Sequence, residues 1–155
     1  MTAYFLDSSA LAKRYVQEPG SSWINALFTE PPSNTIFIAE ITLVELAAAM
    51  ARRVRQGTLT DRQWHDFYVL LMVDHIRGYE IVALDRSGIQ SAMELSLKAG
   101  LRAYDAVQLW SGILAQGKLR ANDLPPLTFV SSDKDLLQAA AAPEYQFQIV
   151  DPNTL

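Results

Sequence analysis

The chain has 155 residues, a length that fits one domain with a hydrophobic core of its own. It contains no cysteine, which excludes disulfide bonds, thiolate zinc sites and cysteine nucleophiles. The net charge of −4 at pH 7 argues against a protein that coats nucleic acid over its whole surface, but it leaves room for a local basic patch.

The first seven residues have no basic start, and their apolar run is too short for a signal peptide. No run in the chain approaches the ~18 apolar residues that a membrane helix needs. We therefore expect a cytoplasmic protein with no membrane association. No repeat or linker divides the sequence, so residues 1–155 are expected to form a single domain.

Strand and helix patterns alternate along the whole chain. Strands are predicted at residues 4–6, 35–39, 79–84, 127–130 and 146–150. Helical patterns cover residues 11–28, with a break near Pro19-Gly20, and then residues 41–56, 60–76, 87–99, 104–115 and 135–141. A turn is predicted at Pro31-Pro32-Ser33-Asn34. The alternation predicts a parallel sheet covered on both faces, with ligands bound beyond the carboxyl ends of its strands.

Two aspartates follow predicted strands directly. Asp7 ends the run Tyr4-Phe5-Leu6, and Asp133 follows Phe129-Val130-Ser131-Ser132. Both therefore fall where an open α/β sheet presents its functional groups. Each aspartate could equally cap the helix that follows it, which is a common position for this residue type. The two roles are compatible, because a capping carboxylate can also face a metal ion.

Glu45 lies inside a predicted helix that offers it no local ion pair. Its neighbours three and four residues away are Ile41, Thr42, Ala48 and Ala49. Because burial of an unpaired carboxylate is costly, Glu45 either faces solvent or is compensated by a metal ion or a distant base. Glu94 differs, since Lys98 follows it four residues later in the favourable orientation for a surface pair. We expect Glu94 on the surface and Glu45 in a site.

Asp105 stands in the first turn of a predicted helix, where the positive end of the helix dipole favours a negative charge. Taken alone, this position explains the residue without a functional role. Asp135 is ambiguous in the same way, because it is either a first-turn residue or an outer ligand near Asp133.

Several carboxylates that converge on one point repel each other. At ~4 Å and an effective dielectric constant of ~20, each charged pair costs about 4 kcal/mol, so a bound cation or protonation is needed. Hard divalent cations prefer oxygen ligands, and the two histidines of the chain leave little room for a histidine-rich site. A carboxylate cluster therefore favours Mg²⁺ or Mn²⁺ over zinc. Such a site can activate water and stabilise the leaving oxygen of a phosphodiester.

Other catalytic arrangements have less support. The serines near the predicted site have no histidine pattern that would build a catalytic triad. We interpret these hydroxyls, including Ser9 and Ser131, as groups that support metal ligands or cap helices. No glycine-rich phosphate loop ending in lysine is present.

Four segments together resemble the PIN domain, the fold of many metal-dependent ribonucleases. They are Phe5-Leu6-Asp7-Ser8-Ser9-Ala10-Leu11, Thr42-Leu43-Val44-Glu45-Leu46, Arg102-Ala103-Tyr104-Asp105-Ala106-Val107-Gln108-Leu109 and Phe129-Val130-Ser131-Ser132-Asp133. Each segment alone is weak evidence, but the four occur in the family's order at suitable spacing. The resemblance spans nearly the whole chain, from about residue 4 to residue 150.

The resemblance implies a three-layer α/β/α sandwich with a central, mostly parallel five-stranded sheet. It implies that Asp7, Glu45 and Asp105 are the principal ligands of one or two Mg²⁺ or Mn²⁺ ions, and that Asp133 binds directly or through water. At this size, a lone PIN domain is similar to the VapC-type toxins of bacterial toxin–antitoxin pairs. That similarity implies an endoribonuclease with an RNA substrate, a homodimer and a cognate antitoxin.

Three basic residues are candidates for substrate binding. Lys13 and Arg14 lie one to two turns beyond Asp7, and Arg102 precedes Asp105. For Lys13 and Arg14, simple exposure of a charged side chain to solvent explains their presence as well as phosphate binding does. Two other functions remain open. One is a PIN-fold nuclease that acts in RNA maturation outside a toxin–antitoxin pair. The other is a non-catalytic RNA- or protein-binding module of the same fold.

Overall fold

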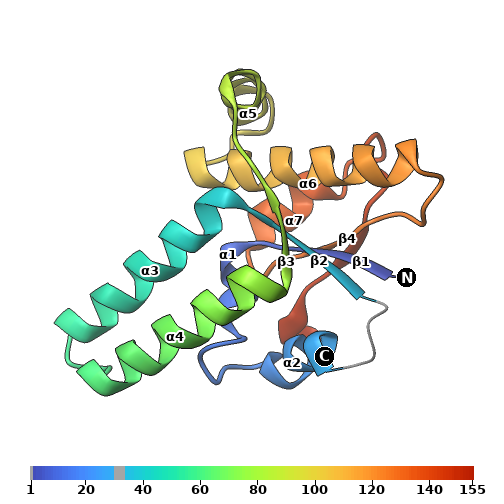
Figure 1. Ribbon diagram of the computed structural model, residues 1–155. Coiled ribbons are helices and arrows are strands. Elements are labelled where there is room, and N and C mark those ends of the chain that lie inside the picture. Colours follow the sequence, from blue (N-terminus) through green and yellow to red (C-terminus); the bar gives the residue numbers. More distant parts are fainter. Residues whose placement is uncertain (1, 30–33) are drawn as a thin grey trace.

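The structure is a computed structural model that describes residues 2–29 and 34–155 (Figure 1). Its centre is a five-stranded sheet in the order β3-β2-β1-β4-β5, in which each neighbouring pair is parallel. The strands are β1 (Thr2–Leu6), β2 (Asn34–Ala39), β3 (Tyr79–Val82), β4 (Thr128–Val130) and β5 (Gln148–Val150). The predicted α/β fold is confirmed, and the sheet is wholly parallel. Of the turn predicted at Pro31-Pro32-Ser33-Asn34, the first three residues lie outside the described residues, and Asn34 is the first residue of β2.

Helices connect the strands. They are α1 (Ser8–Ala12), α2 (Ser21–Thr29), α3 (Glu40–Arg55), α4 (Asp61–Arg77), α5 (Arg86–Ala99), α6 (Ala103–Ala121) and α7 (Lys134–Ala140), and a 3-10 turn, η1 (Pro152–Thr154), follows β5. Helix α4 begins with a capping box between Thr60 and Gln63. Helix α5 ends at Ala99, and the next residue, Gly100, has a φ of 66°, in the left-handed region that favours glycine.

The sheet separates two hydrophobic cores, because successive side chains of a strand point to opposite faces. Phe5 of β1 and Phe129 of β4 pack on one face with residues of α5, α6 and α7. Leu6 of β1 and Val130 of β4 pack on the other face with residues of α1, α2, α3 and α4. This arrangement is the predicted three-layer sandwich. Helices α3 and α4 run beside each other as a hairpin that extends past the sheet (Figure 1).

Several predicted boundaries differ from the structure, and strand β3, predicted over residues 79–84, ends at Val82. Helix α1 ends at Ala12, so the predicted helical stretch of residues 11–28 holds two separate helices with a longer connection. Helix α6 continues to Ala121 instead of stopping at residue 115. Strand β5 begins at Gln148, because Gln146 has a φ of 57° that an extended strand does not allow.

The strand order places a topological switch point between β1 and β4. The chain passes from β1 outward to β2 and β3, and β4 then pairs on the opposite side of β1. Pairing continues just beyond the two strands, where the N–H of Asp7 donates to the carbonyl of Val130 at 3.2 Å. Ligands of open α/β sheets bind at such a point, so the segments after β1 and β4 are the place to look for a site. Within the described ranges, no helix is both long enough and apolar enough to cross a membrane.

Candidate active site

Asp7 lies at the carboxyl end of β1 with 4% of its surface exposed. It caps α1, because its Oδ1 accepts a hydrogen bond from the N–H of Ala10 at 2.8 Å. Burial raises the pKa of Asp7 to about 6; the hydrogen bonds from Ala10, Ser131 and Ser9 oppose this rise, and the nearby charge of Glu45 adds to it. The site therefore holds a carboxylate whose negative charge is poorly compensated by the protein.

Ser9 and Ser131 support Asp7 from two sides. Ser9 Oγ lies 2.8 and 3.0 Å from the two carboxylate oxygens, and Ser131 Oγ donates to Oδ2 at 2.7 Å. The same hydroxyls accept hydrogen bonds from the N–H groups of Ser132 at 2.8 Å and Asp133 at 3.0 Å. These bonds tie the segment after β4 to the segment after β1, so the hydroxyls orient Asp7 and shape the loop that carries Asp133.

Glu45 lies on α3 and is half-buried. Its Oε2 accepts hydrogen bonds from the hydroxyl of Ser8 and, at 2.7 Å, from Nε2 of Gln108 on α6. Within the described part of the chain, Oε1 has no hydrogen-bond partner. The sequence leaves solvent, a metal ion or a distant base as possible compensation for this carboxylate. Among the described residues, its hydrogen-bond donors are two neutral groups. Glu94 is exposed as predicted, although Lys98 pairs with Glu144 at 3.2 Å.

Asp133 caps α7, where its Oδ1 accepts from the N–H groups of Asp135 at 2.9 Å and Leu136 at 3.1 Å. Its Oδ2 has no hydrogen-bond partner among the described residues. Asp135 is exposed in the first turn of the same helix. The capping role considered for Asp133 from sequence is thus present, and it leaves one carboxylate oxygen available.

Asp105 stands in the first turn of α6, as predicted. Its pKa is raised by partial burial and by the charges of Asp133, Glu45 and Asp135, while Arg102 opposes the rise. Asp105 is therefore within electrostatic reach of acids on α3 and α7. Together with the effect of Glu45 on Asp7, these couplings connect all four predicted acids at one edge of the sheet.

The arrangement has the oxygen donors that a hard divalent cation prefers, and no lysine or arginine of the described chain donates a hydrogen bond to the four acids. However, no group of three or more described histidine, aspartate and glutamate side chains is placed so that it could hold a metal ion. The donor set thus fits Mg²⁺ or Mn²⁺ in its chemistry. Binding of an ion would require the carboxylates to move closer together than they stand.

The basic candidates have different surroundings. Arg102 is exposed directly before α6 and acts electrostatically on Asp105. Lys13 is 4% exposed and reaches Asn153 at 2.8 Å and Glu18 at 3.6 Å. Lys13 therefore has partners inside the protein that account for its charge.

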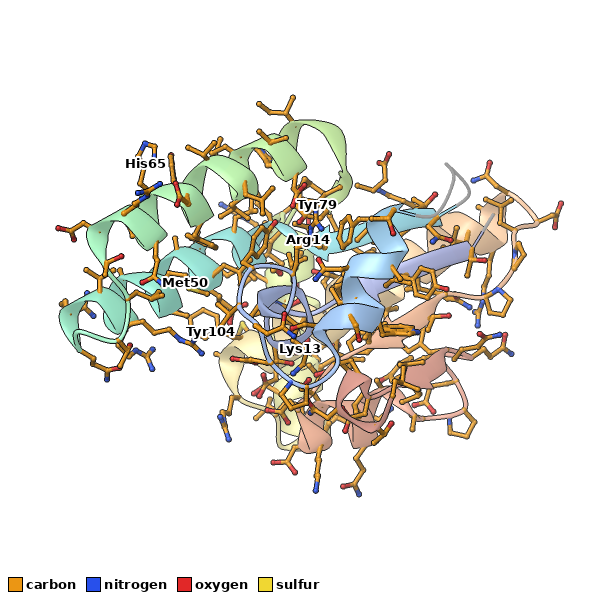
Figure 2. The ribbon with its side chains drawn as sticks, turned by 90° about the horizontal axis from the view of Figure 1, so that it is seen from below. Lys13, Arg14, Met50, His65, Tyr79 and Tyr104 are labelled. Atoms are coloured by element: carbon orange, nitrogen blue, oxygen red, sulfur yellow. The ribbon has the colours of Figure 1, made fainter. Side chains whose placement is uncertain are left out.

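Arg14 belongs to a second polar cluster. Its Nε donates to Asp74 at 3.1 Å, its Nη1 donates to Asn25 at 2.9 Å, and its guanidinium lies over the ring of Phe28. Its side chain lies beside Tyr79 in Figure 2, and Tyr79 and Tyr15 share contacts with the same Asp74 carboxylate. Arg14 therefore links α4 to the segment after α1, and its contacts are structural.

Two polar residues next to the acids, Gln108 and Thr42, have no functional role predicted from the sequence. Both are buried, and they contact each other and the Glu45 environment. One signal was available in the sequence: Gln108 follows Asp105 by three residues, so it lies on the same side of α6, between the apolar residues Val107 and Leu109.

Comparison with known proteins finds likeness in structure but not in sequence. No model of a known protein family matches the chain, and no curated protein matches it. Among solved structures, VapBC2 from Rickettsia felis, bound to a DNA fragment from its promoter, has a TM-score of 0.63 and 15% identity, over 97% of this chain and 98% of that chain. PAE2754 from Pyrobaculum aerophilum has a TM-score of 0.62 and 16% identity, over 99% of this chain and 85% of that one.

A third structure is VapC20 from Mycobacterium tuberculosis, a toxin that cleaves the sarcin-ricin loop. It has a TM-score of 0.60 and 15% identity, over 89% of this chain and 95% of that chain. The neighbours include PIN-fold toxins, and the matches extend over nearly the full length of this chain. The chain has the PIN fold. The expectation of a PIN-like sandwich is therefore confirmed, at an identity that establishes the fold alone.

Proposed function

We propose that this PIN-fold protein is a metal-dependent endoribonuclease and the toxin component of a type II toxin–antitoxin pair. The observation that carries the proposal is the electrostatic coupling of Asp7, Glu45, Asp105 and Asp133 at the carboxyl edge of the sheet. The four acids come from the end of β1, from α3, from α6 and from the loop after β4, and they lie further apart than the ligands of a bound ion. A protein that only bound RNA would have no use for such a concentration of negative charge.

The four acids are the proposed ligands of Mg²⁺ or Mn²⁺, and Asp135 is a proposed outer ligand. In Glu45 and Asp133, one carboxylate oxygen accepts the hydrogen bonds that fix the side chain. The other oxygen, Oε1 of Glu45 and Oδ2 of Asp133, has no hydrogen-bond partner among the described residues, which supports its role as a ligand. When bound, the ion would act as a Lewis acid that activates water and stabilises the leaving oxygen of the phosphodiester. Mutual repulsion among the carboxylates is the physical reason for an ion to bind.

The remaining groups have supporting roles in this proposal. Ser9 and Ser131 hold the Asp7 carboxylate toward the edge of the sheet through hydrogen bonds of 2.7 to 3.0 Å. Arg102 is the basic residue that we propose for contact with an RNA phosphate, because it is exposed beside Asp105. Its charge would offset the repulsion between the acids and the nucleic-acid backbone.

The test is cleavage of a mixed RNA pool by the purified protein with Mg²⁺, with Mn²⁺ or with EDTA. We expect cleavage that requires the metal and falls to background in Asp105→Asn, because this change removes a proposed ligand from a half-buried position. Glu94→Gln is the matched control, since Glu94 is an exposed acid outside the cluster and should leave the rate unchanged. Equal cleavage by the wild type and Asp105→Asn would refute the assignment of the site.

We also propose that the protein forms a homodimer and binds a cognate antitoxin protein. The structural neighbours include toxin–antitoxin complexes, which supports the second part. Exposed apolar side chains along α4 and α5 support association in general. They are Tyr68, Val69, Leu70, Met72, Val73 and Ile76 on α4, and Ile89, Met93 and Leu97 on α5.

Size-exclusion chromatography with light scattering is expected to give a mass twice that of the 17.3 kDa chain. Met93→Lys, which places a charge on the apolar side of α5, should shift the mass toward that of the monomer if α5 lies in the interface. A wild-type mass of one chain at micromolar concentration would contradict the homodimer.

A further inference from the structure

The buried amide of Gln108 contacts Glu45, one of the four acids of the candidate site. Gln108 on α6 is 2% exposed, and its Nε2 lies 2.7 Å from Oε2 of Glu45, 2.9 Å from Oγ of Ser8 and 2.9 Å from Oγ1 of Thr42. One side chain of α6 thus contacts residues of α1 and α3. The shortest of its contacts is to the carboxylate of Glu45.

The orientation of this amide is fixed by its partners. Glu45 Oε2 and the amide oxygen of Gln108 are both acceptors, so Nε2 must face the carboxylate. The Ser8 hydroxyl donates to the same Oε2, which leaves the Ser8 oxygen free to accept from Gln108. Thr42 Oγ1 can donate to Oε1 of Gln108 at 3.4 Å. The network therefore directs two donors to a single oxygen of Glu45.

This asymmetry has a consequence for the other oxygen. With Oε2 held from α1 and α6, rotation of the Glu45 carboxyl group is restricted, and Oε1 remains without a hydrogen-bond partner among the described residues. A ligand oxygen that is held in one orientation binds a metal ion more tightly than a free one, because less side-chain freedom is lost on binding. An exposed glutamate on a helix would have no such restraint.

We propose that Gln108 is a positioning residue, which holds Glu45 by one carboxylate oxygen so that the other faces the metal ion. This inference rests on the proposed function, because it assigns Glu45 to that metal site. Gln108 itself would not touch the ion. Its place three residues after Asp105 on α6 lets one helix supply both a ligand and the group that positions a ligand from α3.

A second buried glutamine on the same helix provides the matched control. Gln116 is 4% exposed, and its Oε1 accepts a hydrogen bond from the backbone N–H of Leu127 at 2.7 Å, away from the four acids. Methionine has a similar length, but it cannot donate the hydrogen bonds of Gln108 and is only a weak acceptor in place of the amide oxygen of Gln116. Gln108→Met and Gln116→Met should each lower stability, but only the first should alter metal binding.

Calorimetric titration with Mn²⁺ separates these two effects. We expect Gln108→Met to weaken Mn²⁺ binding by about 10- to 100-fold, and Gln116→Met to leave it within about twofold of the wild type. In RNA cleavage, raising the Mn²⁺ concentration should recover most of the rate of Gln108→Met. If Gln108→Met does not fold, Gln108→Asn, which keeps an amide that is too short to reach Glu45, should weaken binding in the same way. Unchanged Mn²⁺ affinity in the folded variant would overturn the inference.

Crystal structures of the metal-free wild type and Gln108→Met proteins test the positioning without metal or activity. We expect the Glu45 carboxyl group to leave the hydroxyl of Ser8 in the variant. If the wild type binds no Mn²⁺ but Glu45 moves in this way, the proposed metal site fails while the positioning contact stands. If Glu45 keeps its place, Gln108 does not position it, whatever the result for the metal.

Discussion

Asp7→Asn is expected to abolish metal-dependent RNA cleavage and, at the same time, to make the metal-free protein more stable at pH 7. Burial raises the pKa of Asp7 to about 6, so at neutral pH the folded protein carries a charge that its surroundings disfavour. Asparagine has nearly the same shape and no charge. A pKa about two units above the ordinary value corresponds to about 3 kcal/mol, which is the upper limit of the expected gain.

The sign of the pH dependence follows from linkage. The folded pKa of Asp7, about 6, lies above the ordinary value of 3.8 for an aspartate, so the folded state binds the proton more tightly than the unfolded state. Its contribution to stability is fully present below about pH 4 and is lost as the pH rises through about 6. The difference between Asp7→Asn and the wild type should therefore be large at pH 7.5 and small at pH 4.

Urea unfolding in EDTA at these two pH values measures the difference. Asp85→Asn is the control. Asp85 caps α5 by accepting a hydrogen bond from the N–H of Gly88 at 2.7 Å, and this bond is the main reason that the pKa of Asp85 is lowered. Removal of the Asp85 charge should therefore not stabilise the protein. Addition of Mn²⁺ should raise the melting temperature of the wild type but not that of Asp7→Asn. A wild type that is more stable than Asp7→Asn at pH 7.5 without metal would contradict the electrostatic reasoning.

Much of the fold could be predicted because its signals are local. The strand runs alternate with helical patterns, and this alternation is sufficient to predict a covered parallel sheet. The positions of Asp7 and Asp133 relative to the sheet follow directly from the short strands before them, β1 and β4. Both aspartates also cap helices, as the sequence allowed. Local pattern therefore predicted where these two side chains stand.

The features that were missed depend on contacts between distant parts of the chain. Lys13 can be buried because Asn153, 140 residues further along, accepts a hydrogen bond from its ammonium group and Glu18 balances its charge. Nothing near Lys13 in the sequence indicates that η1 packs beside it. Strand β5 is shorter than predicted because Gln146 has a positive φ. A glutamine in the sequence gives no indication of such a backbone conformation.

Glu45 shows both the strength and the limit of the sequence argument. The absence of a basic residue at helical spacing correctly indicated that Glu45 has no ion pair within α3. Its two donors, Ser8 and Gln108, lie 37 and 63 residues away. The spacing of residues within α3 carries no signal for a neutral amide that lies so far along the chain. Only the packing of α6 against α3 brings that amide into contact.

The packing of α6 depends on a glycine, and Gly112→Ala is expected to destabilise the protein by about 1–3 kcal/mol. A Cβ at Gly112 would lie 2.7 Å from Cε2 and 2.8 Å from Cδ2 of Phe129. Phe129 is fully buried and stacks between Phe5 and Phe147, at centroid distances of 5.1 and 5.3 Å, so its ring has little room to move. The extra methyl group must therefore push α6 away from β4.

Gly117→Ala on the same helix should have the opposite effect. No side chain or distant backbone of the described residues lies within 4 Å of a Cβ at Gly117, so alanine should stabilise the helix by about 0.5–1 kcal/mol. Thermal unfolding of the two variants gives the comparison. Because Asp105 and Gln108 both lie on α6 before Gly112, displacement of the helix should also weaken Mn²⁺ binding in Gly112→Ala alone. Equal stability of the two variants would mean that α6 does not depend on close approach to Phe129.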